Sequence, residues 1–152
     1  MNCFSCGAPV LPEPYMALWS DEPMVYVHCT SYPCNCGEKE IEIPKAHRLS
    51  QRVAEAIAHA PYRLAECQLG YLLRHLDLTW DTAAERFTGS LLSGKLSLEW
   101  PLRRAVTPES ENLRPFAPPA DTLFPMRPKV IAPMTFAYNG SDWHKEEDER
   151  AA

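Results

Sequence analysis

The chain has 152 residues, of which 45% are hydrophobic and 23% charged, which suits one or two small domains rather than a large enzyme core. Its formal net charge of -5 gives no sign of a protein that wraps around nucleic acid. No apolar run approaches the roughly 18 residues of a membrane helix, and the start MNCFSCGAPV lacks the basic and apolar regions of a signal peptide. We therefore expect a cytoplasmic protein that does not bind a membrane.

Charge and proline are unevenly distributed, and this divides the chain into three segments. Residues 1–44 carry one basic and six acidic residues, residues 45–114 carry ten basic and eight acidic residues, and residues 115–152 carry four basic and six acidic residues. Of the 15 prolines, only Pro61 lies between residues 45 and 100. A mildly basic segment that suits helices therefore lies between two acidic segments rich in proline.

The first expected elements are a strand and two helices. The stretch MVYV at residues 24–27 predicts a strand within a short-stranded unit. Apolar side chains at every fourth position predict an amphipathic helix over residues 45–60, which ends before Pro61. A second helix over residues 64–76 has an apolar stripe at helical spacing, formed by Leu69, Leu72, Leu73 and Leu76.

Two further short helices are expected before the proline-rich C-terminal segment begins. Thr79 is a plausible N-cap for the third helix, which buries Ala83, Ala84 and Phe87 and ends at Gly89. A fourth helix over residues 91–100 is expected to stop at Pro101, with a turn or short helix continuing to Arg114. Beyond residue 114, frequent prolines predict a tail without a domain of its own, and Asn139-Gly140 indicates a turn within it.

The cysteines indicate a metal site. Five of the six lie in the first 36 residues, and in a reducing compartment such a cluster points to metal ligands rather than disulfides. Cys3 and Cys6 form a knuckle followed by glycine, and Cys34 and Cys36 form a second pair that is also followed by glycine. Four thiolates of this kind bind Zn²⁺ tetrahedrally and stabilise a segment that has almost no core.

The second pair leaves the ligand set open. It is C-x-C rather than C-x-x-C, so Cys29 or His28 can replace Cys34 if the short turn is strained. A redox role for the C-x-x-C pair is the main rival, but the βαβ setting of redox motifs is missing. A closed four-thiolate site leaves no position for water, so we expect structural zinc and no enzyme.

The helical segment resembles a known family. Residues 69–89, LGYLLRHLDLTWDTAAERFTG, look like the first half of an Xre/Cro-type helix-turn-helix. Upstream, EIPKAHRL (42–49), VAEAI (53–57) and PYRL (61–64) resemble the connector that joins an N-terminal zinc ribbon to that fold. PEPY (12–15) and the stretch from Tyr32 to Glu38 fit the ribbon as well. Over residues 1–114 the chain thus resembles the MqsA-like (YgiT-type) antitoxins and transcriptional regulators.

The resemblance implies an architecture. The expected fold is α+β and mostly α, with a zinc ribbon over residues 1–44, a connecting helix over 45–64, a helix-turn-helix domain over 65–114 and a Pro-rich, acidic-ended tail over 115–152. It also implies a homodimer that binds operator DNA. The acidic ribbon or the tail is then available for a basic protein partner such as a toxin.

The resemblance also implies roles for single residues. Thr79 and Trp80 begin the helix that abuts a DNA phosphate, and residues 91–99 form the recognition helix, with Glu99 at the acidic position that closes it. The sequence departs from the pattern here, because residues 90–98 read SLLSGKLSL. Few of these side chains are polar or basic, as base recognition requires.

The remaining expected DNA contacts are few. In the recognition helix only Ser93, Lys95 and Ser97 can hydrogen-bond to bases, and Arg103 and Arg104 are expected to reach phosphates. We therefore expect a zinc-containing, DNA-binding transcriptional regulator of the antitoxin type. The alternative is a protein-binding module that has lost DNA readout and docks partners through its leucine-rich fourth helix and Pro-rich tail.

Overall fold

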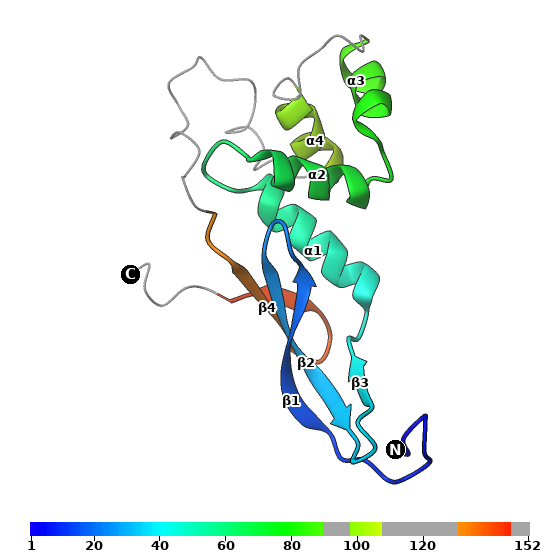
Figure 1. The fold of residues 1–152 in the computed structure, drawn as a ribbon. Coiled ribbons are helices and arrows are strands. Elements are labelled where there is room, and N and C mark those ends of the chain that lie inside the picture. The colour runs from blue at the N-terminus through cyan, green and yellow to red at the C-terminus, as the bar shows by residue number, and fades with distance from the viewer. Residues whose placement is uncertain (90–97, 108–130, 147–152) are drawn as a thin grey trace. The chain divides into compact units, whose positions relative to one another are not determined.

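The computed structural model describes residues 1–89, 98–107 and 131–146, which form an α+β protein with a mixed sheet (Figure 1). The chain divides into two units, residues 1–49 with 132–152, and residues 50–131. The sheet belongs to the first unit, and α2, α3 and α4 belong to the second. In the described part of the chain, every helix is too short or too polar to span a membrane.

The N-terminal half of the sheet is an antiparallel meander. β1 (Glu13–Ser20) pairs with β2 (Val25–Pro33), and β2 pairs with β3 (Lys39–Glu42). The expected strand at residues 24–27 is confirmed as the start of β2, where Val25 and Val27 are fully buried. Alternation along β2 places these valines on one face and Tyr26 and His28 on the other.

The C-terminal segment completes this sheet, which differs from the expected tail. β4 (Met134–Tyr138) pairs with β2 in parallel, and β5 (Trp143–Lys145) pairs with β4 in antiparallel fashion. The order is β1-β2-β4-β5, with β3 on the same edge of β2 as β4 but farther along it. The expectation of a tail is therefore wrong for residues 134–145. The proline-rich residues 115–130 lie outside the described residues.

Buried apolar side chains from three strands meet on one face of the sheet. In the strand register Val27 lies between Ala17 of β1 and Phe136 of β4, and all three side chains are buried. Trp143 of β5 is buried beside Tyr138, with ring centroids 5.3 Å apart. The expected Asn-Gly turn is confirmed between β4 and β5, where Gly140 has a φ of 99° that favours glycine.

The first helix confirms the pattern that predicted it. α1 (Ala46–Ala58) buries Leu49, Val53 and Ile57 almost completely, as their four-residue spacing indicated. It ends two residues earlier than expected, and the backbone N–H of His59 still bonds to the carbonyl of Glu55.

The next two helices bury apolar residues that the sequence pattern placed on their inner faces. α2 (Glu66–His75) buries Leu69, Leu72 and Leu73, and α3 (Trp80–Thr88) buries Ala83 and Ala84. The N-cap of α3 is confirmed at Thr79. Its side chain accepts a bond from the N–H of Thr82 at 3.1 Å, while the hydroxyl oxygen of Thr82 accepts from the N–H of Thr79 at 2.8 Å. Gly89, with a φ of 74°, ends the helix in the left-handed conformation.

The fourth described helix differs from the expectation. α4 (Glu99–Val106) begins where a helix was expected to stop, and Pro101 lies in its first turn. Proline is tolerated there because the first N–H groups of a helix have no partner within it. Residues 90–97, which hold most of the expected recognition helix, and the expected turn over residues 108–114 lie outside the described residues.

A buried ion pair organises the helical unit. Arg103 is 0% exposed and donates hydrogen bonds to the carbonyl oxygens of Ala58, Ala60 and Tyr62 at 2.6 to 3.1 Å. Its guanidinium lies 3.4 Å from the carboxylate of Glu99, which is 1% exposed. Burial lowers the pKa of Arg103 and Glu99 counteracts this. The expected contact of Arg103 with a DNA phosphate does not fit this placement, because the guanidinium is enclosed in the fold and both of its terminal nitrogens donate to groups inside it.

Both carboxylate oxygens of Glu99 accept hydrogen bonds. Its carboxylate accepts a 2.7 Å bond from Nε of Arg63 and a further bond from the backbone N–H of Leu64. The ring of Trp100 lies near two guanidinium groups, with its centroid 6.0 Å from that of Arg63 and 4.9 Å from that of Arg103. The acidic residue expected to close a recognition helix thus starts α4 and neutralises a buried arginine.

Replacing Glu99 by alanine is expected to destabilise the helical unit strongly. The change leaves the charge of Arg103 buried without a carboxylate, which costs about 3–5 kcal/mol in comparable sites. Urea unfolding followed by circular dichroism measures the loss. Glu85→Ala is the matched control, because Glu85 is exposed on α3 and its removal should change stability by no more than about 0.5 kcal/mol. Equal effects of the two changes would contradict the role assigned to Glu99.

Candidate metal centre

The first pair of cysteines lies on a tight turn held by backbone hydrogen bonds. The N–H of Gly7 bonds to the carbonyl of Cys3 at 2.9 Å, and the N–H of Cys3 bonds to the carbonyl of Ala8 at 2.6 Å. Gly7 has a φ of 75°, a conformation that side chains disfavour. The glycine after Cys6 therefore allows the chain to fold back under the two thiols.

The second pair lies between β2 and β3. The N–H of Cys34 bonds to the carbonyl of Glu38 at 2.9 Å, and the N–H of Gly37 bonds to the carbonyl of Cys34 at 3.0 Å. Gly37 has a φ of 95° and repeats the role of Gly7. Because β2 and β3 are paired up to Pro33 and Lys39, the hairpin fixes where these thiols lie.

The four thiols come together. The sulfur atoms of Cys3, Cys6, Cys34 and Cys36 all lie within 4.8 Å of one another. Two of these distances are 3.4 Å, between Cys6 and Cys34, and 3.6 Å, between Cys3 and Cys36. A tetrahedral ion with metal–sulfur bonds of about 2.3 Å requires sulfur–sulfur distances of about 3.8 Å. The cluster can therefore bind a metal ion with small adjustments of the side chains.

The electrostatics of the thiols also suit a cation. The backbone N–H groups of Cys6 and Ser5 lower the pKa of the Cys3 thiol to about 7. The backbone N–H of Cys36 acts in the same direction on Cys34, but the neighbouring Cys6 and Cys36 side chains outweigh it and raise the pKa of Cys34 to about 12. Thiols this close cannot all ionise without a positive charge among them, and a bound metal ion supplies that charge.

The alternative ligands lie outside this cluster. Cys29 is within β2 and is not one of the grouped thiols, and burial raises its pKa. His28 forms a 3.1 Å contact with the carboxylate of Glu146. The structure thus brings together the four cysteines favoured by the sequence pattern, and the strained-turn alternative is not needed.

The residues expected to contact DNA are placed only in part. Thr79 caps α3 and Trp80 is the first residue of that helix, while Arg104 is exposed on α4. Arg103 is buried, as described above. The three recognition-helix residues Ser93, Lys95 and Ser97 lie outside the described residues. The signal that sequence reasoning missed is the four-residue spacing of Glu99 and Arg103, which suits an ion pair on one helix face.

Comparisons with known proteins add no relative: no family model, curated protein or solved structure matches this chain.

Serine substitution separates the metal ligands from the remaining cysteines. We expect Cys3→Ser and Cys36→Ser to remove bound metal, because each takes one sulfur from the four-thiol cluster. Cys29→Ser is the matched control in the same unit and should retain one metal ion per chain. Elemental analysis of the purified variants measures both the metal content and its identity. A wild-type protein that is folded but metal-free would contradict the site.

Proposed function

We propose that this protein is a zinc-stabilised transcriptional regulator of the antitoxin type that binds operator DNA as a homodimer. The observation that carries the proposal is the succession of α2, a four-residue connection from Leu76 to Thr79, and the capped helix α3. Two helices joined by a turn of this length are typical of DNA-binding helix-turn-helix motifs.

The start of α3 suits the phosphate contact expected for Thr79 and Trp80. Backbone N–H groups and the helix dipole make a helix N-terminus favourable for an anion. The reciprocal bonds between Thr79 and Thr82 fix where the helix begins. On α4, the exposed Arg104 supplies a cation in the same unit, which is available for a second phosphate.

Zinc is the proposed metal because four thiolates are its usual structural ligand set. In this role the ion fixes the N-terminal knuckle and the β2–β3 hairpin relative to each other, in a segment with little apolar core. Four protein ligands complete the tetrahedral shell, so the proposed role of the ion is structural and the proposal includes no enzymatic reaction.

One observation favours a second candidate, a module that binds protein rather than DNA. The burial of Arg103 removes one of the two expected phosphate contacts after the recognition helix. Each lost phosphate contact weakens DNA binding and its dependence on salt. A basic protein such as a toxin would then be the main partner, attracted by the acidic N-terminal segment.

A mobility shift with the DNA upstream of the protein's own gene distinguishes the two candidates. If the regulator proposal holds, Arg104→Ala weakens binding and lowers the slope of log affinity against log salt by about 0.9 for each lost phosphate contact. The measurement is a titration of protein into labelled DNA at several salt concentrations.

Lys39→Ala is the matched control for this titration, because it removes one positive charge from the sheet-containing unit. It should leave DNA affinity unchanged. No salt-dependent shift at micromolar wild-type protein would exclude the DNA role and leave the protein-binding candidate.

A further inference from the structure

The N-terminal knuckle exposes an aromatic side chain. Phe4 lies between the ligand-forming Cys3 and Ser5, and it is 95% exposed. Leu11 and Met1 in the same loop are 80% and 61% exposed. Small proteins rarely expose several large apolar side chains on one short loop, and where they do, the exposed patch commonly marks a binding site.

The backbone around Phe4 is held in place. The N–H of Val10 bonds to the carbonyl of Met1 at 2.9 Å, and Asn2 forms a β-bridge with Pro9. Together with the turn at Gly7, these bonds make a small hairpin whose tip carries Phe4. An aromatic residue on a rigid loop loses little conformational entropy when it packs against a partner.

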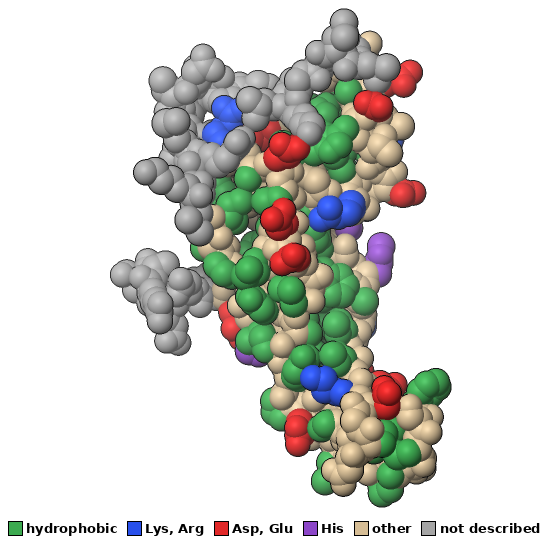
Figure 2. All heavy atoms as spheres, viewed as in Figure 1, with side chains coloured by type: hydrophobic (Ala, Val, Ile, Leu, Met, Phe, Trp, Pro, Cys, Tyr) green, Lys and Arg blue, Asp and Glu red, His purple; other side chains and the backbone are tan. Residues whose placement is uncertain are grey.

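A small cavity lies beside Phe4. Its volume is about 170 Å³, and its walls include apolar Phe4 and Val10, the ring of Tyr32, and the acidic residues Glu38 and Glu40. We call these five residues the tip surface. The hydroxyl of Tyr32 donates a 2.7 Å bond to the carboxylate of Glu42, which fixes the ring at the cavity wall. Figure 2 shows apolar and acidic side chains next to one another at the N-terminal end of the sheet-containing unit.

The charge around the cavity selects the class of partner. Lys39 is the one basic residue in the first 44, and its ammonium lies 4.0 Å from the ring centroid of Tyr15. Six acidic residues accompany it, and the cavity wall holds two of them together with Lys39 itself, which leaves the wall with a net negative charge. Exposed aromatics on zinc-binding loops can stack on nucleic-acid bases, but the net negative charge of the wall and of the first 44 residues repels phosphates. A basic polypeptide is favoured by both the charge and the apolar surface.

We propose that the tip surface binds a basic segment of a partner protein. An apolar side chain of the segment packs on Phe4 and Val10, and neighbouring lysine or arginine side chains pair with Glu38 and Glu40. The inference rests on the metal site of the proposed function, because the ion holds the knuckle that carries Phe4. It does not depend on DNA binding.

The test uses fluorescence anisotropy with the full chain and three labelled peptides. The first alternates lysine and leucine, the second alternates glutamate and leucine, and the third alternates lysine and serine. We expect the first to bind at least about tenfold more tightly than the other two, since the surface requires both charge and an apolar anchor. Phe4→Ser should reduce its affinity by about tenfold, and the Glu38→Gln, Glu40→Gln double variant should remove most of its salt dependence.

Two matched controls make this result specific. Leu18→Ser removes a half-exposed apolar side chain from β1, and Glu13→Gln removes a carboxylate outside the cavity wall. Both should bind the first peptide as the wild type does. Equal losses in Phe4→Ser and Leu18→Ser, or tighter binding of a single-stranded RNA than of the peptide, would overturn the inference.

Metal content is measured in parallel. A metal-free wild type contradicts the proposed zinc site. A metal-loaded protein that does not bind the peptide contradicts only the binding role proposed for the tip surface.

Discussion

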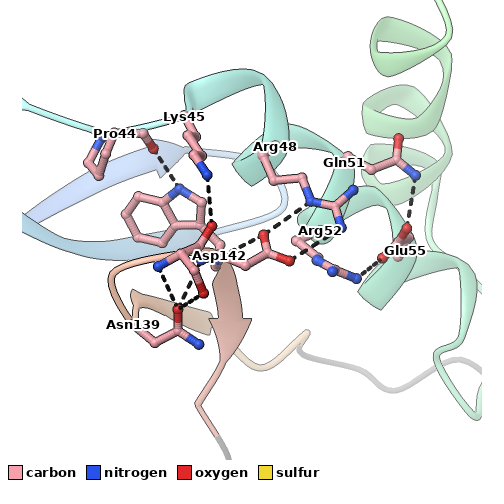
Figure 3. A network of polar contacts seen from close by, with 10 residues as sticks. Pro44, Lys45, Arg48, Gln51, Arg52, Glu55, Asn139 and Asp142 are labelled. Carbon is pink, nitrogen blue, oxygen red and sulfur yellow. Dashed lines mark hydrogen bonds and ion pairs between the residues drawn. The ribbon is translucent and has the colours of Figure 1, made fainter.

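The return of the C-terminal strands to β2 is the constraint on which the sheet-containing unit depends. A parallel pair such as β2 and β4 cannot be closed by a tight turn, so the chain must leave the sheet and come back. Side-chain contacts secure the returning strands (Figure 3). Nε1 of Trp143 donates a 2.7 Å bond to the carbonyl of Pro44, and the carboxylate of Asp142 accepts two bonds from Arg48. The loop between β4 and β5 is thereby fixed to the start of α1.

Hydrogen bonds within the loop itself also fix its shape. Oδ1 of Asn139 accepts bonds from the backbone N–H groups of Ser141 and Asp142, both at 2.9 Å. The ammonium of Lys45 then bonds to the carbonyl of Ser141 at 3.0 Å. Single exposed ion pairs contribute little to stability, but here a buried indole and a capped turn accompany the pair of Arg48 and Asp142. The same strand β2 pairs with β4 at one end and leads into Cys34 at the other, so one strand supports both the returning hairpin and the metal centre.

The sequence predicts the features whose geometry depends on a few consecutive residues. The spacing of Cys3 and Cys6 and the glycines after each pair identified the four grouped thiols, because a knuckle is built from a few consecutive residues. The N-cap at Thr79 was predictable for the same reason. Pairing of β4 with β2 was not, since its partner lies far away in the sequence and the prolines before it suggested a tail. Arginine is rarely fully buried, so Arg103 was assigned to the surface, and only the packed structure shows the three carbonyls that accept its bonds.

The burial of Arg103 also bears on how the helical unit can act. A side chain that is enclosed by carbonyl oxygens and Glu99 stabilises the junction of α4 with the residues after α1, and it cannot neutralise a phosphate at the same time. Among the basic residues expected to contact DNA, the described part of the chain leaves Arg104 exposed. A monomer with few phosphate contacts binds DNA weakly, whereas two copies on adjacent half-sites combine their contacts. The proposed DNA function therefore requires a dimer, whereas the proposed binding of a basic segment beside Phe4 requires only a single chain.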